Sequence, residues 1–320
     1  MKYKILNAES QNYSPKAKVI LESIANVDYF ANLSKSKMKE KITDFHGLIV
    51  RLENYIGPEI IKKGNRLLFI ATATTGLDHI DLKAAKDKGV EIISLFGEKK
   101  FLDDINATAE HTMALMLSLV RHIPFAHADV FLGFWRRDKF RGMELGGKTL
   151  GIIGMGRLGR KVAHYATEFG MKVITYDPYL KKKPTCVALS SIKRLLSEAD
   201  IVTLHIPLNE STRNIFNEDY FKLMKKDSLL INTSRGEVVD EKALLRSLTE
   251  KRIRGAALDV LTGECDERIL KKHPLINYAK KNSNIIITPH LGGATWESME
   301  KTEIFIAQKI KDFLTRYRKI

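Results

Sequence analysis

Apolar positions along this chain alternate between two periods, and the alternation predicts a parallel α/β fold. Short continuous apolar runs are typical of buried strands, and stretches with apolar residues three or four apart are typical of amphipathic helices. Helical periods fall between the runs, for example at Pro15–Ile24 and Leu82–Lys88. The strands expected in the first part of the chain are Tyr3–Leu6, Val27–Phe30, Gly47–Val50, Leu67–Ala71 and Val90–Ile93.

The same alternation resumes in the second half of the chain. Strands are expected at Ile201–Ile206, Ser228–Ile231, Gly255–Val260 and Asn284–Thr288. A long helix that ends near Pro124 is also expected, with Asp103, Asp104 and Asn106 as cap candidates. A last helix from Thr295 onward has no sheet of its own to cover, so we expect it to return to the first domain.

The stretch from Phe125 to Gly147 differs from the segments around it. It is rich in aromatic and basic residues but has no clean period. Such an apolar excursion favours an oligomer arm or a packing element over a ligand site.

The stretch from Thr149 to Asp177 organises the second half of the chain. An apolar strand leads into Gly154, Gly156 and Gly159, a helical pattern follows, and a second strand ends on Asp177. The glycines permit a tight turn, a close approach of the backbone to a pyrophosphate, and close packing of helix on strand. An acidic residue at Asp177 accepts hydrogen bonds from ribose hydroxyls and repels a 2'-phosphate. This unit predicts a dinucleotide site that prefers NAD to NADP.

Composition excludes several classes of protein. No apolar run is long enough for a membrane span, and the N-terminus lacks the features of a signal peptide, so a cytoplasmic protein with no membrane partner is expected. The net charge of +15 is spread in short clusters, among them Lys181–Lys183, without interleaved aromatics. This favours a solvated surface over a nucleic-acid site. Cys186 and Cys265 have no metal-ligand spacing, so plain thiols and no metal site are expected.

Three residues that could do chemistry follow strands of the cofactor half. Arg235, Glu264 and His290 would all lie at the carboxyl edge of the sheet. An arginine can clamp a carboxylate, and a histidine beside a carboxylate can transfer a proton. Taken singly, each has a plain alternative as a surface ion pair or a loop residue.

Two loops of the first domain are candidates for binding a substrate carboxylate. They are Arg51–Asn54 and Thr72–Gly76, and each follows an expected strand. From spacing alone, ordinary polar loops are an equally good interpretation.

Motifs along nearly the whole chain resemble the D-isomer-specific 2-hydroxyacid dehydrogenase family. They are TTGLDHIDL, NATAEHTMALML, GKTLGIIGMGRLG, YDPY, LHIPL, NTSRGEVVDEKAL, ALDV and ITPHLGGAT, in the family's order. The resemblance implies a Rossmann cofactor domain, residues 103–292, inserted into a flavodoxin-like substrate domain, residues 1–102 with 293–320. It also implies that the excursion at about 125–147 is a dimer arm, and hence a homodimer.

The resemblance assigns roles residue by residue. Arg235, Glu264 and His290 match the catalytic arginine, glutamate and acid/base histidine, and Asp259 matches the acid that contacts the nicotinamide carboxamide. We also expect Thr108 and Thr212 to contact the cofactor. Other matches to the cofactor cleft are Arg157, Leu158, His205, Pro207 and Thr233, and the expected substrate-binding residues are Arg51, Leu52, Thr75 and Gly76 together with Arg235 and His290.

Three departures from the family pattern stand out. Asp104–Glu110 differs from the usual motif, the segment after Asp177 is short, and Cys265 follows Glu264 where proline is usual. The expectation is an NAD-dependent oxidoreductase that acts on a small D-2-hydroxy acid or its 2-keto acid, with no regulatory domain after the last helix. The rival is an NAD-sensing protein like the family's transcriptional corepressors, which keep the same three residues.

Overall fold

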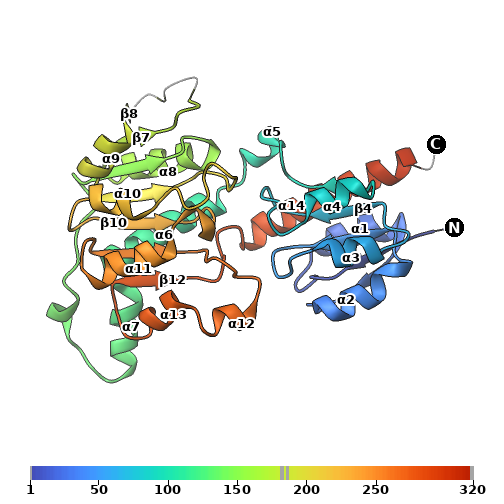
Figure 1. The fold of residues 1–320 in the computed structure, drawn as a ribbon, viewed down its shortest axis with the longest axis horizontal. Coiled ribbons are helices and arrows are strands. Elements are labelled where there is room, and N and C mark those ends of the chain that lie inside the picture. The colour runs from blue at the N-terminus through green and yellow to red at the C-terminus, as the bar shows by residue number, and fades with distance from the viewer. Residues whose placement is uncertain (1, 181–183, 185–186, 318–320) are drawn as a thin grey trace. The chain divides into compact units, whose positions relative to one another are not determined.

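The computed structural model describes residues 2–180, 184 and 187–317, and it divides the chain into two compact units. One unit takes residues 1–105 together with 294–320, and the other takes residues 106–293. Each unit contains one sheet, and all the strand pairs of both sheets are parallel. Figure 1 shows helices on both faces of each sheet. The prediction of two parallel-sheet domains is therefore confirmed.

The first unit has the strand order β2-β1-β3-β4-β5, which is the flavodoxin-like order. Its strands are β1 (Tyr3–Asn7), β2 (Ala25–Tyr29), β3 (Gly47–Val50), β4 (Phe69–Thr72) and β5 (Glu91–Ile93). Its helices are α1 (Pro15–Glu22), α2 (Lys35–Lys41), α3 (Pro58–Lys63), α4 (Leu82–Asp87), α5 (Lys99–Leu102) and α14 (Trp296–Tyr317), with a 3-10 turn η1 (Ile42–Asp44). Helices α2, α3 and α4 pack on one face of the sheet, and α1 and α14 pack on the other.

The second unit has the order β12-β11-β10-β9-β6-β7-β8, which is a Rossmann order with one added strand. Its strands are β6 (Thr149–Ile153), β7 (Lys172–Tyr176), β8 (Ala188–Leu189), β9 (Ile201–Leu204), β10 (Leu229–Asn232), β11 (Gly255–Leu258) and β12 (Ile285–Ile287). Its helices are α6 (Ala107–Val120), α7 (Ile123–Phe131), α8 (Arg157–Glu168), α9 (Ile192–Glu198), α10 (Glu218–Leu223), α11 (Glu241–Thr249), α12 (Glu267–Leu270) and α13 (Pro274–Ala279), with 3-10 turns η2 (Arg137–Phe140) and η3 (Gly236–Val238). The strand order reverses between β6 and β9, which is where doubly wound sheets bind their ligands.

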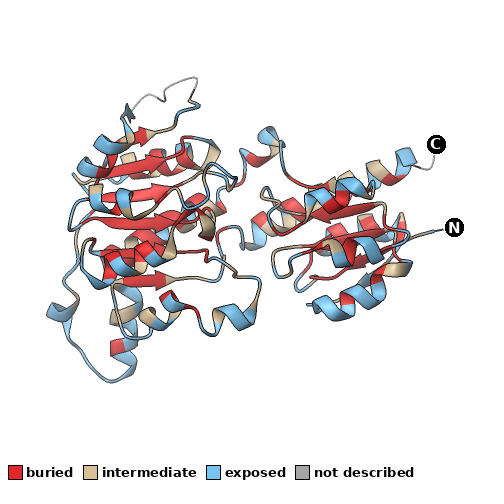
Figure 2. Cartoon of the chain, viewed as in Figure 1, coloured by how far each residue is buried: buried red, intermediate tan, exposed pale blue. Residues whose placement is uncertain are grey.

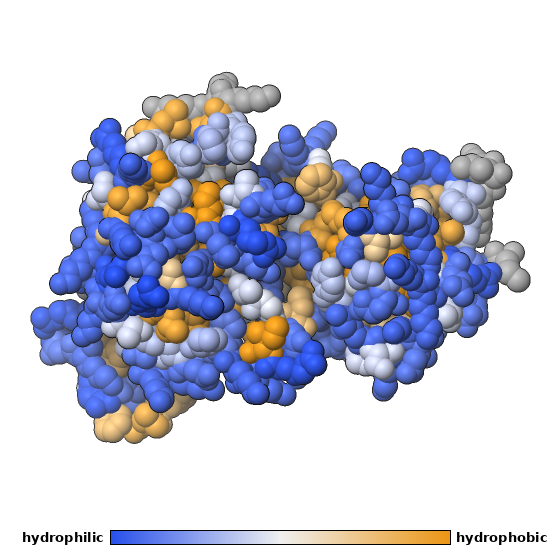
Figure 3. Space-filling model, in the orientation of Figure 1, coloured by the Kyte–Doolittle hydropathy of each residue, from blue (hydrophilic) through white to orange (hydrophobic). Residues whose placement is uncertain are grey.

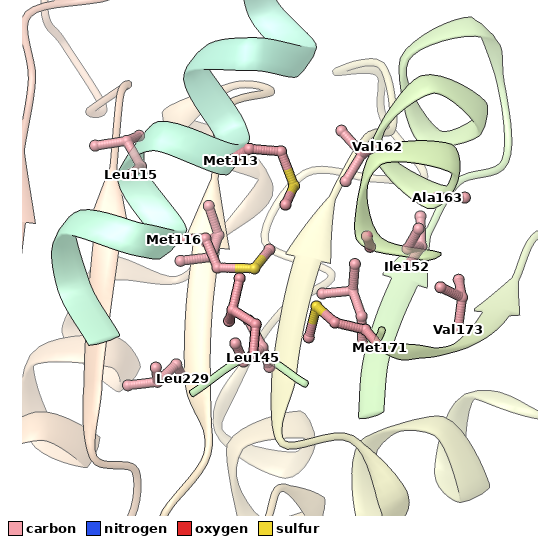
Figure 4. Close-up of a cluster of buried hydrophobic side chains, with 14 of the residues drawn as sticks. Met113, Leu115, Met116, Leu145, Ile152, Val162, Ala163, Met171, Val173 and Leu229 are labelled. Carbon is pink, nitrogen blue, oxygen red and sulfur yellow. The ribbon is translucent and has the colours of Figure 1, made fainter. Parts of the chain in front are cut away.

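The central strands of this sheet are buried on both faces, as their continuous apolar content predicts. Every residue of β9, β10 and β11 is buried (Figure 2). On one face, Met113 and Met116 of α6 and Val162 of α8 pack over Ile152 of β6 (Figure 4). Methionine fills the irregular space between helix and sheet because its side chain is unbranched and adaptable.

The long helix expected to reach Pro124 ends instead at Val120, so that boundary was wrong. A second helix, α7, begins at Ile123 and carries Pro124 in its first turn. Proline removes a hydrogen-bond donor from a helix interior but fits the first turn, where the N–H has no partner in the helix. The expected excursion at 125–147 therefore begins as a helix. Asn106 is the N-cap residue of α6, but its side chain makes no capping hydrogen bond.

The segment from α7 to η2 exposes large apolar side chains. Phe131 is 77% exposed, Leu132 72% and Trp135 87%. Asp129 is buried beneath them and binds the side chains of Arg136 and Lys139. Figure 3 shows hydrophobic side chains gathered at the end of the second unit where α7 lies. We call residues 123–140 the arm.

The structure bears on two further expectations from composition. Cys265 is an exposed thiol, whereas Cys186 and the Lys181–Lys183 cluster lie outside the described residues. None of the helices that the structure describes is long and apolar enough to cross a membrane.

A buried ion pair ties α14 to the loop after β3. Glu303 is 1% exposed, binds the guanidinium of Arg51, and accepts a hydrogen bond of 2.7 Å from the backbone N–H of Ser14. The pattern of apolar positions around Arg51 and Glu303 does not indicate this contact, because the two residues are far apart in the chain.

Removing this buried carboxylate should destabilise the protein strongly. Glu303→Ala leaves the Arg51 guanidinium without its counter-charge, and we expect a loss of about 3 kcal/mol in the free energy of unfolding. Urea denaturation followed by circular dichroism measures it. Glu300→Ala on the same helix is the control: Glu300 pairs with Lys16 in solvent, so its loss should cost less than about 1 kcal/mol. Equal effects of the two variants would contradict the assignment.

Candidate active site

Three chemically capable side chains follow three adjacent strands of the second unit. Arg235 comes after β10, Glu264 after β11 and His290 after β12. Because these strands are parallel neighbours, their carboxyl ends lie along one edge of the sheet.

Glu264 and His290 are in direct contact. The Oε1 atom of Glu264 lies 2.5 Å from Nδ1 of His290, and Oε2 accepts a hydrogen bond of 3.0 Å from the backbone N–H of Leu261. The two side chains are 26% and 21% exposed, so the pair reaches solvent or a ligand. A carboxylate at Nδ1 holds a proton there and leaves Nε2 as the ring nitrogen that exchanges a proton.

The loop that carries His290 is folded around the carboxylate of Asp259. This side chain is 1% exposed and accepts hydrogen bonds from the hydroxyl of Thr288 at 2.6 Å and from the backbone N–H groups of Leu291 and Gly292 at 2.8 and 2.7 Å. The backbone N–H of His290 donates to the carbonyl of Asp259 at 2.8 Å. His290 itself has a φ of 53°, in the left-handed region that a β-carbon disfavours. These bonds hold the histidine in a conformation that it would not adopt alone.

His111 of α6 completes the surroundings of Asp259. Its Nε2 lies 3.0 Å from Oδ1 of Asp259 and 3.1 Å from the hydroxyl of Thr288. Burial raises the pKa of Asp259, but the hydrogen bonds from His111, Thr288 and Leu291 outweigh burial and bring the pKa below its usual value. Sequence reasoning missed His111. The available signal was its helical spacing from Thr108, which places both on one face of α6.

Arg235 lies at the start of η3, in a loop that packs closely on the loop of Glu264. One guanidinium nitrogen donates to the carbonyl of Ser234 at 2.7 Å, and the side chain of Asn232 donates to the carbonyl of Arg235 at 2.9 Å. A β-carbon on Gly236 would lie 2.2 Å from the carbonyl carbon of Leu261, so only glycine fits there. The two loops are therefore in contact.

The glycine turn after β6 has the geometry that its sequence indicates. Gly154 has a φ of 93°, and a β-carbon on Gly159 would lie 2.1 Å from the carbonyl oxygen of Gly154. Gly156 caps α8, and a β-carbon there would meet nothing within 4 Å. Open space therefore lies before the N-terminus of α8, whose first residues are Arg157 and Leu158, and the positive end of a helix dipole suits a pyrophosphate.

Asp177 follows β7 and is joined to this turn. Its Oδ2 accepts a hydrogen bond of 2.8 Å from the backbone N–H of Met155, and its Oδ1 accepts one of 2.9 Å from Tyr179. Each oxygen of a carboxylate can accept two hydrogen bonds, so acceptor capacity is left for the two hydroxyls of a ribose.

The other expected cofactor residues lie along the same edge or on α6. His205 follows β9, its Nε2 lies 3.1 Å from the hydroxyl of Thr203, and burial lowers its pKa to about 4. Its imidazole is therefore uncharged at neutral pH. Thr212 donates to the carbonyl of Pro207 at 2.7 Å and so closes the loop after His205.

Thr233 follows β10 and Thr108 belongs to α6, which packs on the sheet next to it. The hydroxyl of Thr233 is buried and lies 2.8 Å from the hydroxyl of Thr112, which in turn lies 2.8 Å from the carbonyl of Thr108. The methyl group of Thr108 approaches Gly292, where a β-carbon would lie 3.1 Å away. Thr108 is thus near the loop of His290.

The expected substrate residues belong to the first unit and follow β3 and β4. Thr75 is exposed, and Gly76 accepts a hydrogen bond of 2.8 Å from the hydroxyl of Thr74. The Arg51 guanidinium is bound to Glu303, and the adjacent Leu52 is half-buried. No group of His, Cys, Asp and Glu side chains among the described residues has the arrangement of a metal site.

Comparison with known proteins identifies the family. Residues 113–292 match the family model described as "D-isomer specific 2-hydroxyacid dehydrogenase, NAD binding domain". The D-3-phosphoglycerate dehydrogenase of Methanocaldococcus jannaschii is 38% identical over 299 residues, which are 92% of this chain and 55% of that protein. The hydroxypyruvate reductase of Thermotoga maritima is 35% identical over 87% of this chain and 88% of that protein.

A solved structure agrees with these matches. The D-lactate dehydrogenase of Aquifex aeolicus, complexed with NAD and lactic acid, has a TM-score of 0.83 and 31% identity, over 98% of this chain and 95% of that one. The chain spans about half the length of the D-3-phosphoglycerate dehydrogenases that it matches. The glycine turn, the helix that follows it and the family match agree on NAD as the cofactor. This chain belongs to the D-isomer specific 2-hydroxyacid dehydrogenase family.

Proposed function

We propose that the protein interconverts a small D-2-hydroxy acid and its 2-keto acid, with NAD(H) as the hydride carrier. The observation that carries the proposal is the contact of 2.5 Å between Glu264 and Nδ1 of His290 at the carboxyl edge of the NAD-binding sheet. A histidine oriented in this way can exchange a proton through Nε2 at the oxygen on C2 of the substrate.

Arg235, Glu264 and His290 each have a distinct task in this proposal. In the reducing direction, Arg235 binds the substrate carboxylate and polarises the keto oxygen through its guanidinium. His290 gives its proton to that oxygen. Glu264 stabilises the positive charge of the imidazole before the transfer and keeps the ring oriented after it.

The residues around the glycine turn fit the cofactor. The N–H groups at the start of α8 would hold its pyrophosphate, and Asp177 would accept hydrogen bonds from its ribose. When bound, NADH supplies the hydride that C2 receives. Asp259 and His111 do not take part in the transfer, but they hold the loop that presents His290.

Replacing His290 should abolish most turnover and leave cofactor binding intact. His290→Asn tolerates the left-handed backbone at this position but cannot transfer the proton. We expect kcat for reduction of 2-keto acids by NADH to fall by roughly 10² to 10⁴. The dissociation constant of NADH, measured by fluorescence, should change less than about twofold because the Glu264–His290 pair holds no part of the cofactor.

The control for this variant is His164→Ala on the exposed face of α8, which should leave kcat unchanged. Near-normal turnover by His290→Asn would refute the assigned role. A wild-type protein that binds NADH but reduces none of a panel of 2-keto acids would instead support the rival function, an NAD-sensing binding protein.

Asp177 should set the choice between the two nicotinamide cofactors. Its carboxylate repels a 2'-phosphate, so the wild type should bind NADH at least about tenfold more tightly than NADPH. Asp177→Asn removes the charge and should reduce that ratio. Binding constants from fluorescence titration measure it, with the exposed Asp219→Asn as the control variant. Tighter binding of NADPH by the wild type would overturn this role.

We also propose that the arm forms a homodimer contact. Its exposed Phe131, Leu132 and Trp135 make an apolar surface that a second copy of the chain would cover. Trp135→Glu should shift the molar mass in solution, measured by light scattering, from dimer toward monomer. Trp296→Glu introduces the same change at another exposed tryptophan and should not. A monomeric wild type would contradict the proposal.

A further inference from the structure

A further pair of glutamate and histidine side chains lies in the second unit, next to the loop that carries Glu264. Glu241 is the first residue of α11, and its Oε2 atom lies 3.1 Å from Nε2 of His273, the N-cap residue of α13. The side chains of Glu241 and His273 are 17% and 4% exposed. Because an ionised carboxylate only accepts hydrogen bonds, Nε2 of His273 is the donor in this contact. The proposed function gives neither residue a task.

Two consecutive peptide groups of the loop after β11 join this pair to the pair of the active site. The backbone N–H of Thr262 donates to Oε1 of Glu241 at 2.8 Å, and the backbone N–H of Leu261 donates to Oε2 of Glu264 at 3.0 Å. The other oxygen of Glu264 is the one that lies 2.5 Å from Nδ1 of His290. A shift of Thr262 would therefore move the peptide group that orients Glu264.

Packing alone does not set the direction of these N–H groups. The loop lies against Gly236, where a β-carbon would be 2.2 Å from the carbonyl carbon of Leu261 and 2.3 Å from the nitrogen of Thr262. This contact limits how closely the loop after β10 is approached. A hydrogen bond is directional, so the carboxylate of Glu241 fixes the orientation of the peptide in a way that the contact with Gly236 does not.

Helix α11 does not need Glu241 as a cap. Asp240 is its N-cap residue, and the Asp240 carboxylate accepts hydrogen bonds from the backbone N–H groups of Lys242 and Ala243 at 3.0 and 3.2 Å. Burial raises the pKa of Glu241, and the hydrogen bonds from Thr262 and His273 oppose that rise. The Glu241 side chain is thus held by the loop after β11 and by α13, and not by its own helix.

We propose that Glu241 and His273 are positioning residues, which hold the Leu261–Thr262 peptide so that Glu264 meets Nδ1 of His290. Glu241 contributes an oxygen acceptor for Thr262, and His273 fixes the rotation of that carboxylate. The expected effect on turnover rests on the proposed function, whereas the effect on the orientation of His290 does not. All the contacts involved lie within the second unit.

The structural test determines which ring nitrogen of His290 carries the proton. NMR of the full, NAD⁺-bound chain with ¹⁵N-labelled histidine, in alkaline buffer, should place it on Nδ1, as the contact with Glu264 requires. His290→Asn assigns the signal. Glu241→Ala should give a mixture of the two tautomers, whereas Glu241→Gln keeps an oxygen acceptor for Thr262 and should keep the proton on Nδ1.

Glu218→Ala is the matched control. Glu218 is the first residue of α10 and binds Arg246 of α11, so it also joins a helix start to another element, but at a distance from the loop after β11 in the chain. The tautomer of His290 and kcat should stay as in the wild type. His273→Asn keeps a residue suited to a helix N-cap, and it should lower the share of the Nδ1 tautomer without changing α11.

Kinetics test the consequence for the reaction. Glu241→Ala should lower kcat for reduction of 2-keto acids by NADH about 10- to 100-fold, because a catalytic group misplaced by about 1 Å can cost that much. Glu241→Gln should stay within about threefold of the wild type. The dissociation constant of NADH should change less than about twofold in both, since the pair adjoins the loop after β11 and not the glycine turn.

A double variant shows whether Glu241 acts through Glu264. In a Glu264→Gln background, Glu241→Ala should lower kcat less than about twofold further, because residues that act as one unit are not additive. The inference is overturned by a wild-type His290 without its proton on Nδ1, by an unchanged tautomer in Glu241→Ala, by equal damage from Glu241→Gln, or by additive losses. The expected tautomers in a protein that reduces no 2-keto acid overturn only the proposed function.

Discussion

The loop that carries His290, at the carboxyl edge of the second unit's sheet, depends on one buried carboxylate. Asp259 accepts hydrogen bonds from a helix, from a strand end and from two backbone N–H groups of the loop after β12. A buried charge is tolerated only when its hydrogen bonds are satisfied, and here satisfying them folds the loop. His290 is held in its left-handed conformation by that loop, and its contact with Glu264 follows.

The first unit uses the same device at its own carboxyl edge. Glu9 and Glu303 are as deeply buried as Asp259. Glu9 accepts from two backbone N–H groups and the side chain of Asn54, and Glu303 accepts from one backbone N–H group and the side chain of Arg51. In both units a carboxylate thus organises the loops that follow parallel strands. The consequence for chemistry differs, because the donors that the structure describes at Asp259 are a histidine, a hydroxyl and two backbone N–H groups, whereas Glu303 takes up the positive charge of Arg51.

Backbone geometry at glycine sets the cofactor side. Gly154 needs a positive φ, and Gly159 needs the absence of a β-carbon, so the turn after β6 admits little else at either position. The space before Gly156 is different, because a β-carbon there would touch nothing in the protein. Its glycine is explained by what must approach the start of α8 and not by the packing of the fold.

The sequence by itself determined the parallel sheets, the glycine turn and the position of Arg235, Glu264 and His290 at strand ends. These follow from local periodicity and from the rule that parallel strands place their carboxyl ends together. It did not determine where the helix near Pro124 ends, since a proline is compatible with a helix start as well as a stop. Only the tertiary structure decided that His111 contacts Asp259 and that Arg51 is paired with Glu303. Such contacts join residues far apart in the chain, and a charged residue after a strand has the same local pattern whether it faces a ligand or a buried counter-charge.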